Sequence, residues 1–152
     1  MKNRTIWFDM DGTIADLYNV KDWLKMLRNY DVTPYEVAMP MLDMDKFSII
    51  LNRIQAHGCK LGIVSWLSRE PQAEYDQAVI KAKKSWLKKY LPLVSWDEIN
   101  IVAHGTPKSL FIKSKEDILF DDEEKNRNEW RANYAYTPDD IFAVLTKIAL
   151  DC

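Results

Sequence analysis

The stretch Thr5-Ile6-Trp7-Phe8-Asp9-Met10-Asp11-Gly12-Thr13 decides the fold. Its first four residues are apolar or β-branched and predict a short buried strand, and two carboxylates follow where that strand ends. Because side chains at i and i+2 lie on one side of an extended segment, we expect Asp9 and Asp11 to face one pocket. Gly12 permits a tight turn directly after them, which brings backbone N–H groups near an anion.

Short β-rich runs recur between segments of helical spacing along the rest of the chain. The further runs are 61–64, 99–102, 118–120 and, more weakly, 133–136, and their apolar character predicts strands buried on both faces. Helical stripes, each expected to be buried, are Val20, Trp23, Leu24 and Leu27; Phe47, Ile50, Leu51 and Ile54; Tyr75, Val79, Ala82, Trp86 and Tyr90; and Ile141, Val144, Leu145 and Ile148. This alternation predicts an α/β fold with a three-layer Rossmann-like core and a mainly parallel sheet, which binds ligands beyond the carboxyl ends of its strands.

Length and composition narrow the class of protein. With 152 residues and 47% hydrophobic content, we expect residues 1–152 to form a single domain, with an insertion over about 14–42. Pro34 and Pro40 interrupt this insertion, which is too long for a simple crossover.

A net charge of -2 provides no general attraction toward nucleic acid or anionic membranes. Cys59 and Cys152 form neither a disulfide framework nor a metal motif, so we expect a reducing, cytoplasmic setting. The amino-terminal residues show no apolar signal region, and no run of apolar residues is long enough to span a membrane.

Polar residues also follow the other predicted strands. Ser65 and Trp66 follow the second strand, where a hydroxyl and nearby backbone N–H groups suit a phosphoryl oxygen, although a serine there is more often only a cap. Lys108 lies in the loop after the third strand, placed to neutralise phosphate. Asp121 and Asp122 follow the fourth strand, where an acidic pair either completes a Mg²⁺ site or simply begins a helix.

Taken in order, Asp9/Asp11, Ser65, Lys108 and Asp121/Asp122 resemble the four motifs of the haloacid dehalogenase superfamily. The resemblance implies that Asp9 is a nucleophile that forms an aspartyl-phosphate, and that Asp11 is its acid/base partner. It also implies a Mg²⁺ shell formed by Asp9, the backbone carbonyl of Asp11 and Asp121, with Asp122 nearby. The choice between Asp121 and Asp122 as direct ligand stays open. Ser65 and Lys108, with Gly12 and Trp66, are the expected phosphate-binding residues, and Lys113 and Lys115 are rivals for the role of Lys108.

The same resemblance gives expectations about the substrate. An insertion after the first motif matches the subgroup with a small helical cap, and the motifs are loosely similar to those of the 5′(3′)-deoxyribonucleotidases, so the expected substrate is a small phosphomonoester such as a nucleoside monophosphate. Tyr18, Trp23 and Trp66 are candidates for stacking on a base, although the helical stripe assigns Trp23 to the core. Arg69 is either a second anion site or simply exposed. A polynucleotide substrate is disfavoured because we interpret one group of lysines as a solvated helix face: Lys81, Lys83, Lys84, Lys88 and Lys89.

Two rival functions remain at this point. A catalytically silent phosphate-binding or regulatory module has the same scaffold but usually lacks a nucleophile, acid or lysine, and none is missing here. A phosphotransferase or phosphomutase passes the phosphoryl group to an acceptor other than water. The sequence does not separate these from a hydrolase, and it does not indicate the oligomeric state.

Overall fold

The computed structural model describes residues 4–151. A five-stranded sheet forms its centre, with the strand order β5-β4-β1-β6-β7 and every pairing parallel. The strands are β1 (Thr5–Phe8), β4 (Lys60–Trp66), β5 (Glu98–Val102), β6 (Ile118–Phe120) and β7 (Tyr134–Tyr136). All five predicted strands are therefore present. Residues 1–3 and Cys152, on which part of the predicted cellular setting depended, lie outside the described range.

Burial follows the position of each strand in the sheet. The central strand β1 and its neighbour β6 are buried along their whole length, as the apolar runs predict. The edge strands β5 and β7 are half-buried throughout, so the prediction of burial on both faces is wrong for these two. An edge strand has a neighbour on one side only and is covered less completely.

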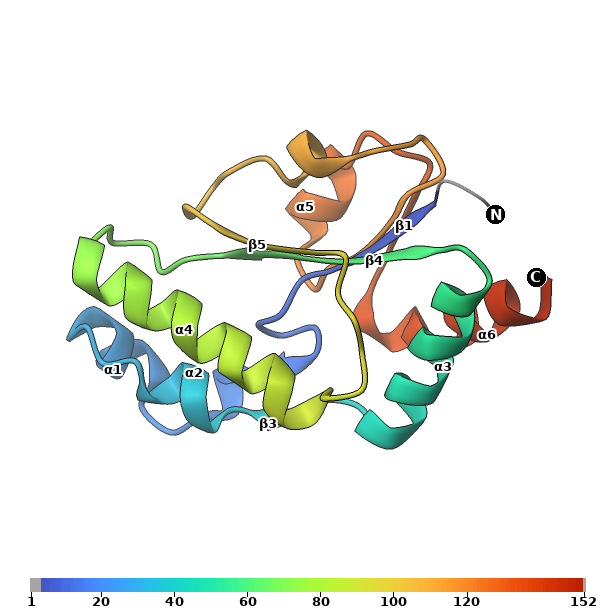
Figure 1. Cartoon of the computed structure of the whole chain (residues 1–152). Helices are drawn as coiled ribbons and strands as arrows, with labels where there is room; N and C mark the ends of the chain where they lie inside the picture. The colour runs from blue at the N-terminus through green and yellow to red at the C-terminus, as the bar shows by residue number, and fades with distance from the viewer. Residues whose placement is uncertain (1–3, 152) are drawn as a thin grey trace.

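Helices cover both faces of the sheet (Figure 1). On one face lie α3 (Met44–Ala56), α4 (Ala73–Tyr90) and α6 (Ile141–Asp151), which meet the largest apolar cluster around Phe8, Phe47 and Ile63. The other face carries the 3₁₀ turn η2 (Lys108–Phe111) and α5 (Glu124–Glu129), with a smaller cluster around Trp7 and Trp130. A further 3₁₀ turn, η3 (Pro138–Asp140), leads into α6 behind its N-cap Thr137. The predicted three-layer α/β architecture is confirmed.

Residues 14–42, called here the 14–42 segment, lie beyond the carboxyl end of the sheet (Figure 1). The segment starts and ends in a small antiparallel pair, β2 (Ala15–Asp16) with β3 (Met39–Pro40). Between these strands come η1 (Leu17–Asn19), α1 (Trp23–Arg28) and α2 (Thr33–Val37), and α2 packs on α4.

The helix predicted from Val20 onward starts only at Trp23. Asp22 before it has a left-handed backbone with φ of 60°, which a helix does not accommodate. No residue of α1 is fully buried, but Trp23 and Leu27 are half-buried and pack against the cluster around Leu17 and Tyr35, so the helix buries its stripe only in part. Within residues 4–151, no helix is long and apolar enough to span a membrane.

Asp117 joins the start of β6 to β1. Its fully buried carboxylate accepts hydrogen bonds from the backbone N–H of Thr5 at 2.9 Å, from Trp7 Nε1 at 3.2 Å and from the backbone N–H of Lys113 at 2.8 Å. Asp117→Ala leaves three donors without an acceptor, so we expect the free energy of unfolding to fall by about 2 kcal/mol in urea titration. The exposed Asp139→Ala serves as control, and equal stability of the two variants would contradict this role.

Candidate functional site

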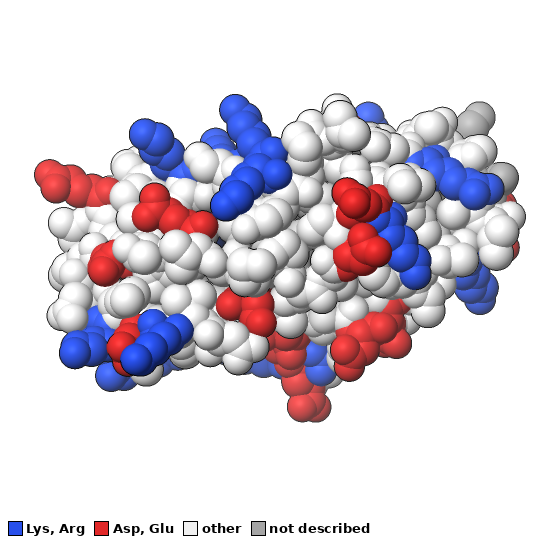
Figure 2. All heavy atoms as spheres, turned by 90° about the horizontal axis from the view of Figure 1, so that it is seen from below, with Lys and Arg blue, Asp and Glu red and all other residues white. Residues whose placement is uncertain are grey.

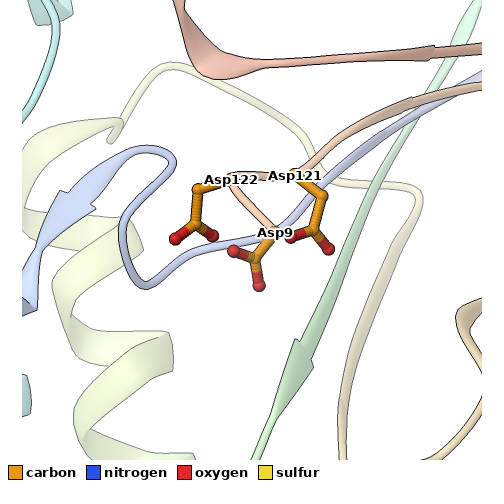
Figure 3. Close-up of side chains that lie close together, drawn as sticks. All are labelled: Asp9, Asp121 and Asp122. Carbon is orange, nitrogen blue, oxygen red and sulfur yellow. The ribbon is translucent and has the colours of Figure 1, made fainter. Parts of the chain in front are cut away.

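Parallel pairing brings three carboxylates together at the carboxyl end of the sheet. Asp9 follows β1 and Asp121 follows β6, and the backbone N–H of Asp9 donates to the carbonyl of Phe120 at 3.0 Å. Figure 3 shows the side chains of Asp9, Asp121 and Asp122 gathered around one point. One carboxylate oxygen from each lies within 4.8 Å of the others. Asp9 and Asp121 are 112 positions apart in the sequence, and the parallel pairing of β1 with β6 brings them together.

Two further residues fix these carboxylates. Buried Thr13 donates its hydroxyl to Asp9 Oδ2 at 2.9 Å and accepts the backbone N–H of Asp122 at 3.2 Å. Buried Asn126, on α5, donates to Asp121 Oδ2 at 3.1 Å. Sequence reasoning did not assign either residue a role. The signal for Asn126 was its place one helical turn after the Asp121-Asp122 pair.

Lys108 sits between the strand ends as the sequence predicts. Its side chain is only 3% exposed, and Nζ lies 2.8 Å from Asp9 Oδ1 and 2.6 Å from Asp121 Oδ2. Burial alone lowers the pKa of this ammonium, but the carboxylates of Asp9 and Asp121 outweigh burial and raise the pKa. The rivals lie elsewhere: Lys113 is exposed and pairs with Glu98 at 3.3 Å, and Lys115 is exposed.

The donor set fits Mg²⁺, which prefers hard carboxylate oxygens. Burial, with the negative charge of Asp9 next in importance, raises the pKa of Asp121 to about 6 and that of Asp122 to about 8. These carboxyl groups ionise with difficulty because one lysine cannot balance three acids in a confined space. Asp122 is the more accessible of the pair, since Asp121 is fully buried and bonded to Lys108. Asp121 and Asp122 therefore both stay candidates for the direct Mg²⁺ ligand.

Lys83 corrects the interpretation of the α4 lysines as a solvated face. Lys81, Lys84, Lys88 and Lys89 are exposed, but Lys83 is 1% exposed and reaches the site. Its Nζ lies 2.9 Å from Asp11 Oδ2. The signal was present in the sequence, because Lys83 falls four residues after Val79 and three before Trp86, on the buried stripe.

Asp11 thus occupies a charge environment different from that of Asp9. Its side chain is 17% exposed and is paired with Lys83, not with Lys108. Burial raises the pKa of Asp11, the charge of Asp9 adds to this rise, and Lys83 opposes it. Two carboxylates two positions apart therefore have different partners.

The remaining predicted residues stand at the edge of the site. Ser65 is fully buried, and its Oγ accepts a hydrogen bond from Lys83 Nζ at 2.7 Å. Gly12 has φ of +81° and donates its N–H to the carbonyl of Ala15 at 2.8 Å, so its contribution is conformational. A Cβ at Gly12 would lie 2.8 Å from Tyr18 Cε2, which leaves no room for a side chain. The Trp66 indole donates to the carbonyl of Thr106 at 2.8 Å, and its ring covers the Lys108 ammonium at 5.2 Å.

A cavity of about 500 Å³ opens over the carboxylates. Its floor is polar, and its far wall comes from the 14–42 segment, the end of β4 and the loop that follows it, with these apolar and aromatic residues: Leu17, Tyr18, Trp23, Leu24, Leu27, Tyr35, Trp66 and Leu67. Trp23, assigned to the core from its stripe, is half-buried and faces this cavity, with its ring 4.9 Å from that of Tyr18. Arg28 and Arg69 line the cavity as well, and both are exposed.

Comparison with known proteins bears on the fold. No protein-family model matches the sequence. No curated protein matches it either. Among solved structures, the chain is similar to D,D-heptose 1,7-bisphosphate phosphatase from Burkholderia thailandensis, with a TM-score of 0.57 over 97% of each chain and 13% sequence identity. The two chains share a fold.

Proposed function

We propose that the protein is a Mg²⁺-dependent phosphomonoester hydrolase that acts through an aspartyl-phosphate on Asp9. The observation that carries this proposal is that the two carboxylates of the first motif lie in different environments. Asp9 lies in the acidic cluster beside Lys108, whereas Asp11 is largely buried beside Lys83 and has a raised pKa. Neighbouring carboxyl groups in different environments are typical of sites that need one nucleophile and one acid.

In the first step a carboxylate oxygen of Asp9 attacks phosphorus, and the bond from phosphorus to the leaving oxygen breaks. Asp11 gives its proton to that oxygen, so the products are an aspartyl-phosphate and an alcohol. Lys108 directs two of its three N–H donors to Asp9 and Asp121, which leaves the third for a phosphoryl oxygen.

In the second step Asp11, now a carboxylate, takes a proton from water as the water oxygen attacks phosphorus. The bond to Asp9 breaks, inorganic phosphate leaves, and Asp11 is protonated again. Asp9 with Asp121 or Asp122 would hold Mg²⁺, together with the backbone carbonyl of Asp11 that the family resemblance implies, and the ion would supply positive charge to offset the repulsion between carboxylates and phosphate.

For the substrate, the proposal is a small phosphomonoester with a planar or apolar leaving group, such as a (deoxy)nucleoside monophosphate. A cavity of about 500 Å³ is in the range of small-molecule sites. The similar structure is a phosphatase named for a sugar bisphosphate. The wall formed by Leu17, Trp23, Leu24 and Leu27 suits a polar sugar poorly, and it supports the nucleotide instead. The 14–42 segment serves in this proposal as the small cap.

A polynucleotide substrate has less support. Figure 2 shows basic and acidic side chains interspersed on the helical face that it displays, without a broad basic surface. Nucleic-acid binding depends on a continuous basic stripe that neutralises several phosphates.

The test of this function is phosphate release from an aryl phosphate, a nucleoside monophosphate, a sugar phosphate and a 3′-phosphorylated oligonucleotide, each with Mg²⁺ or with a chelator. We expect Mg²⁺-dependent release, fastest among the natural esters for the nucleoside monophosphate. Release of the leaving alcohol without inorganic phosphate, and only when an alcohol acceptor is supplied, would favour a phosphotransferase. The absence of release from every ester would favour the silent module.

Mg²⁺ binding is expected to tighten as pH rises from 6 to 8. The pKa of Asp121 is about 6 and that of Asp122 about 8 without metal, so at low pH the ion must displace protons. One displaced proton changes the apparent affinity by up to about tenfold per pH unit. Calorimetry in buffers of different ionisation enthalpy measures the protons released. An affinity that does not change over this range would contradict the prediction.

A further inference from the structure

Lys83 is a buried cation in a helix stripe that otherwise consists of apolar side chains. It lies on α4 among Val79, Ala82 and Trp86, and only 1% of its surface is exposed. Replacing a buried ion pair with apolar side chains of similar volume is often neutral or stabilising. Stability therefore gives no reason for a lysine at this position, and its contacts point to the site.

The ammonium of Lys83 has no donor left for a substrate. Its three N–H groups point to Asp11 Oδ2 at 2.9 Å, Ser65 Oγ at 2.7 Å and the carbonyl of Trp66 at 2.7 Å. An ammonium has three donors, so this set is complete. Lys108 differs, because two carboxylates occupy only two of its donors. The two buried lysines of the site therefore have different roles.

Water is kept from the Lys83 contacts by the 14–42 segment. The ring of Tyr35, itself 5% exposed, lies 5.0 Å from Lys83 Nζ, and the Tyr35 hydroxyl is bonded to Ser68 at 2.7 Å. Two of the Lys83 acceptors belong to the end of β4, which is rigidly paired in the sheet. Asp11 is thus tied to the sheet through one ammonium.

We infer that Lys83 is a positioning residue that holds Asp11 on its Oδ2 side, so that the other carboxyl oxygen faces the leaving group. This role rests on the proposed phosphatase function. A misplaced acid slows chemistry most where the leaving oxygen needs a proton, because general acid catalysis contributes most for poor leaving groups. Loss of Lys83 should therefore slow esters with poor leaving groups more than esters with good ones, as loss of the acid Asp11 would.

The experiment compares Lys83→Met with the natural protein on two esters, p-nitrophenyl phosphate, whose leaving group needs no proton, and an alkyl phosphate, whose leaving group does. We expect kcat/KM, which reports only the steps up to formation of the aspartyl-phosphate, to fall by about 100-fold for the alkyl ester and by less than about 10-fold for the aryl ester. kcat also contains the second step, in which Asp11 acts as base for both esters, so the comparison is made in kcat/KM. The affinity for Mg²⁺ should change little. Asp11→Asn should show the same pattern, and the exposed Lys84→Met, one residue along α4, should match the natural protein.

Aryl ester hydrolysis by Lys83→Met also reports that the variant is folded. If Lys83→Met does not fold, Ser65→Ala is the second variant, because it removes one acceptor of the Lys83 ammonium. It should lower kcat/KM less than Lys83→Met does, and again more for the alkyl ester than for the aryl ester. Equal losses of kcat/KM on both esters, or no loss, would overturn the positioning role while the natural protein remains active. A natural protein that hydrolyses neither ester would overturn the proposed function and this role together.

Discussion

Asp9→Asn will lower the rate of aryl phosphate hydrolysis by about 10⁴-fold or more, since removing a nucleophile abolishes the covalent route. The amide is a poor nucleophile and a weaker ligand for Mg²⁺. The variant should nevertheless stay folded, because Lys108 keeps its ion pair with Asp121 at 2.6 Å and the cluster loses one of its repelling charges. The measurement is steady-state release of the aryl alcohol, with circular dichroism as the check on folding.

Two comparisons make this result specific. Asp139→Asn, exposed and far along the chain in η3, should keep full activity. Acid quenching of the natural protein during turnover of a ³²P-labelled ester should trap radioactivity on the chain, and Asp9→Asn should trap none. An active Asp9→Asn variant would refute the covalent mechanism.

Lys108→Met is expected to damage stability and activity together. Its Nζ is the cation that Asp9 and Asp121 share, and removing one partner of a buried ion network costs about 3 to 5 kcal/mol. Without Mg²⁺ we expect a loss of about 3 kcal/mol in unfolding free energy, part of which Mg²⁺ restores by supplying positive charge. With saturating Mg²⁺, hydrolysis should still fall by about 10²-fold or more, because one donor to the phosphoryl group is missing.

Lys113→Met and Lys115→Met are the matched controls. Both side chains are exposed, and the only ion pair that the structure shows for the described part of this loop is the surface contact of Lys113 with Glu98 at 3.3 Å. Surface pairs of this kind contribute about 0 to 1 kcal/mol, so both variants should retain stability and activity. If Lys115→Met were the inactive variant, the assignment of Lys108 would be wrong.

The architecture could be predicted from the sequence because strand and helix signals were strong and local. Each β-rich run became a strand, and the stripe from Phe47 to Ile54 became one face of α3. The strand order was not available from periodicity, since pairing joins segments far apart in the chain. The helix predicted from Val20 is present from Trp23, but its stripe is not fully buried because Trp23, Leu24 and Leu27 line a cavity. Periodicity does not distinguish a cavity wall from a core.

The part of the candidate site that lies at the strand ends could be predicted from the sequence. Asp9, Lys108, Asp121 and Asp122 come together because parallel strands place their carboxyl ends at one edge. Lys83 was assigned to solvent because lysines on a helix are usually exposed, and its contact with Asp11 spans 72 positions. Whether Ser65 binds phosphate stays a prediction, and the structure shows its hydroxyl on Lys83.

The position of β1 has a consequence for how the site withstands thermal fluctuation. β1 pairs with β4 on one side and β6 on the other, so its amide hydrogens are released to solvent only when the sheet itself opens. The 14–42 segment is joined to the rest of the chain by the two-residue pair β2 and β3 and by the packing of α2 on α4, and much of its surface is exposed, so it opens at a lower free energy than the sheet. Excursions of the native state will therefore uncover the cavity and admit ligands while Asp9 keeps its place in the slowest-exchanging part of the molecule.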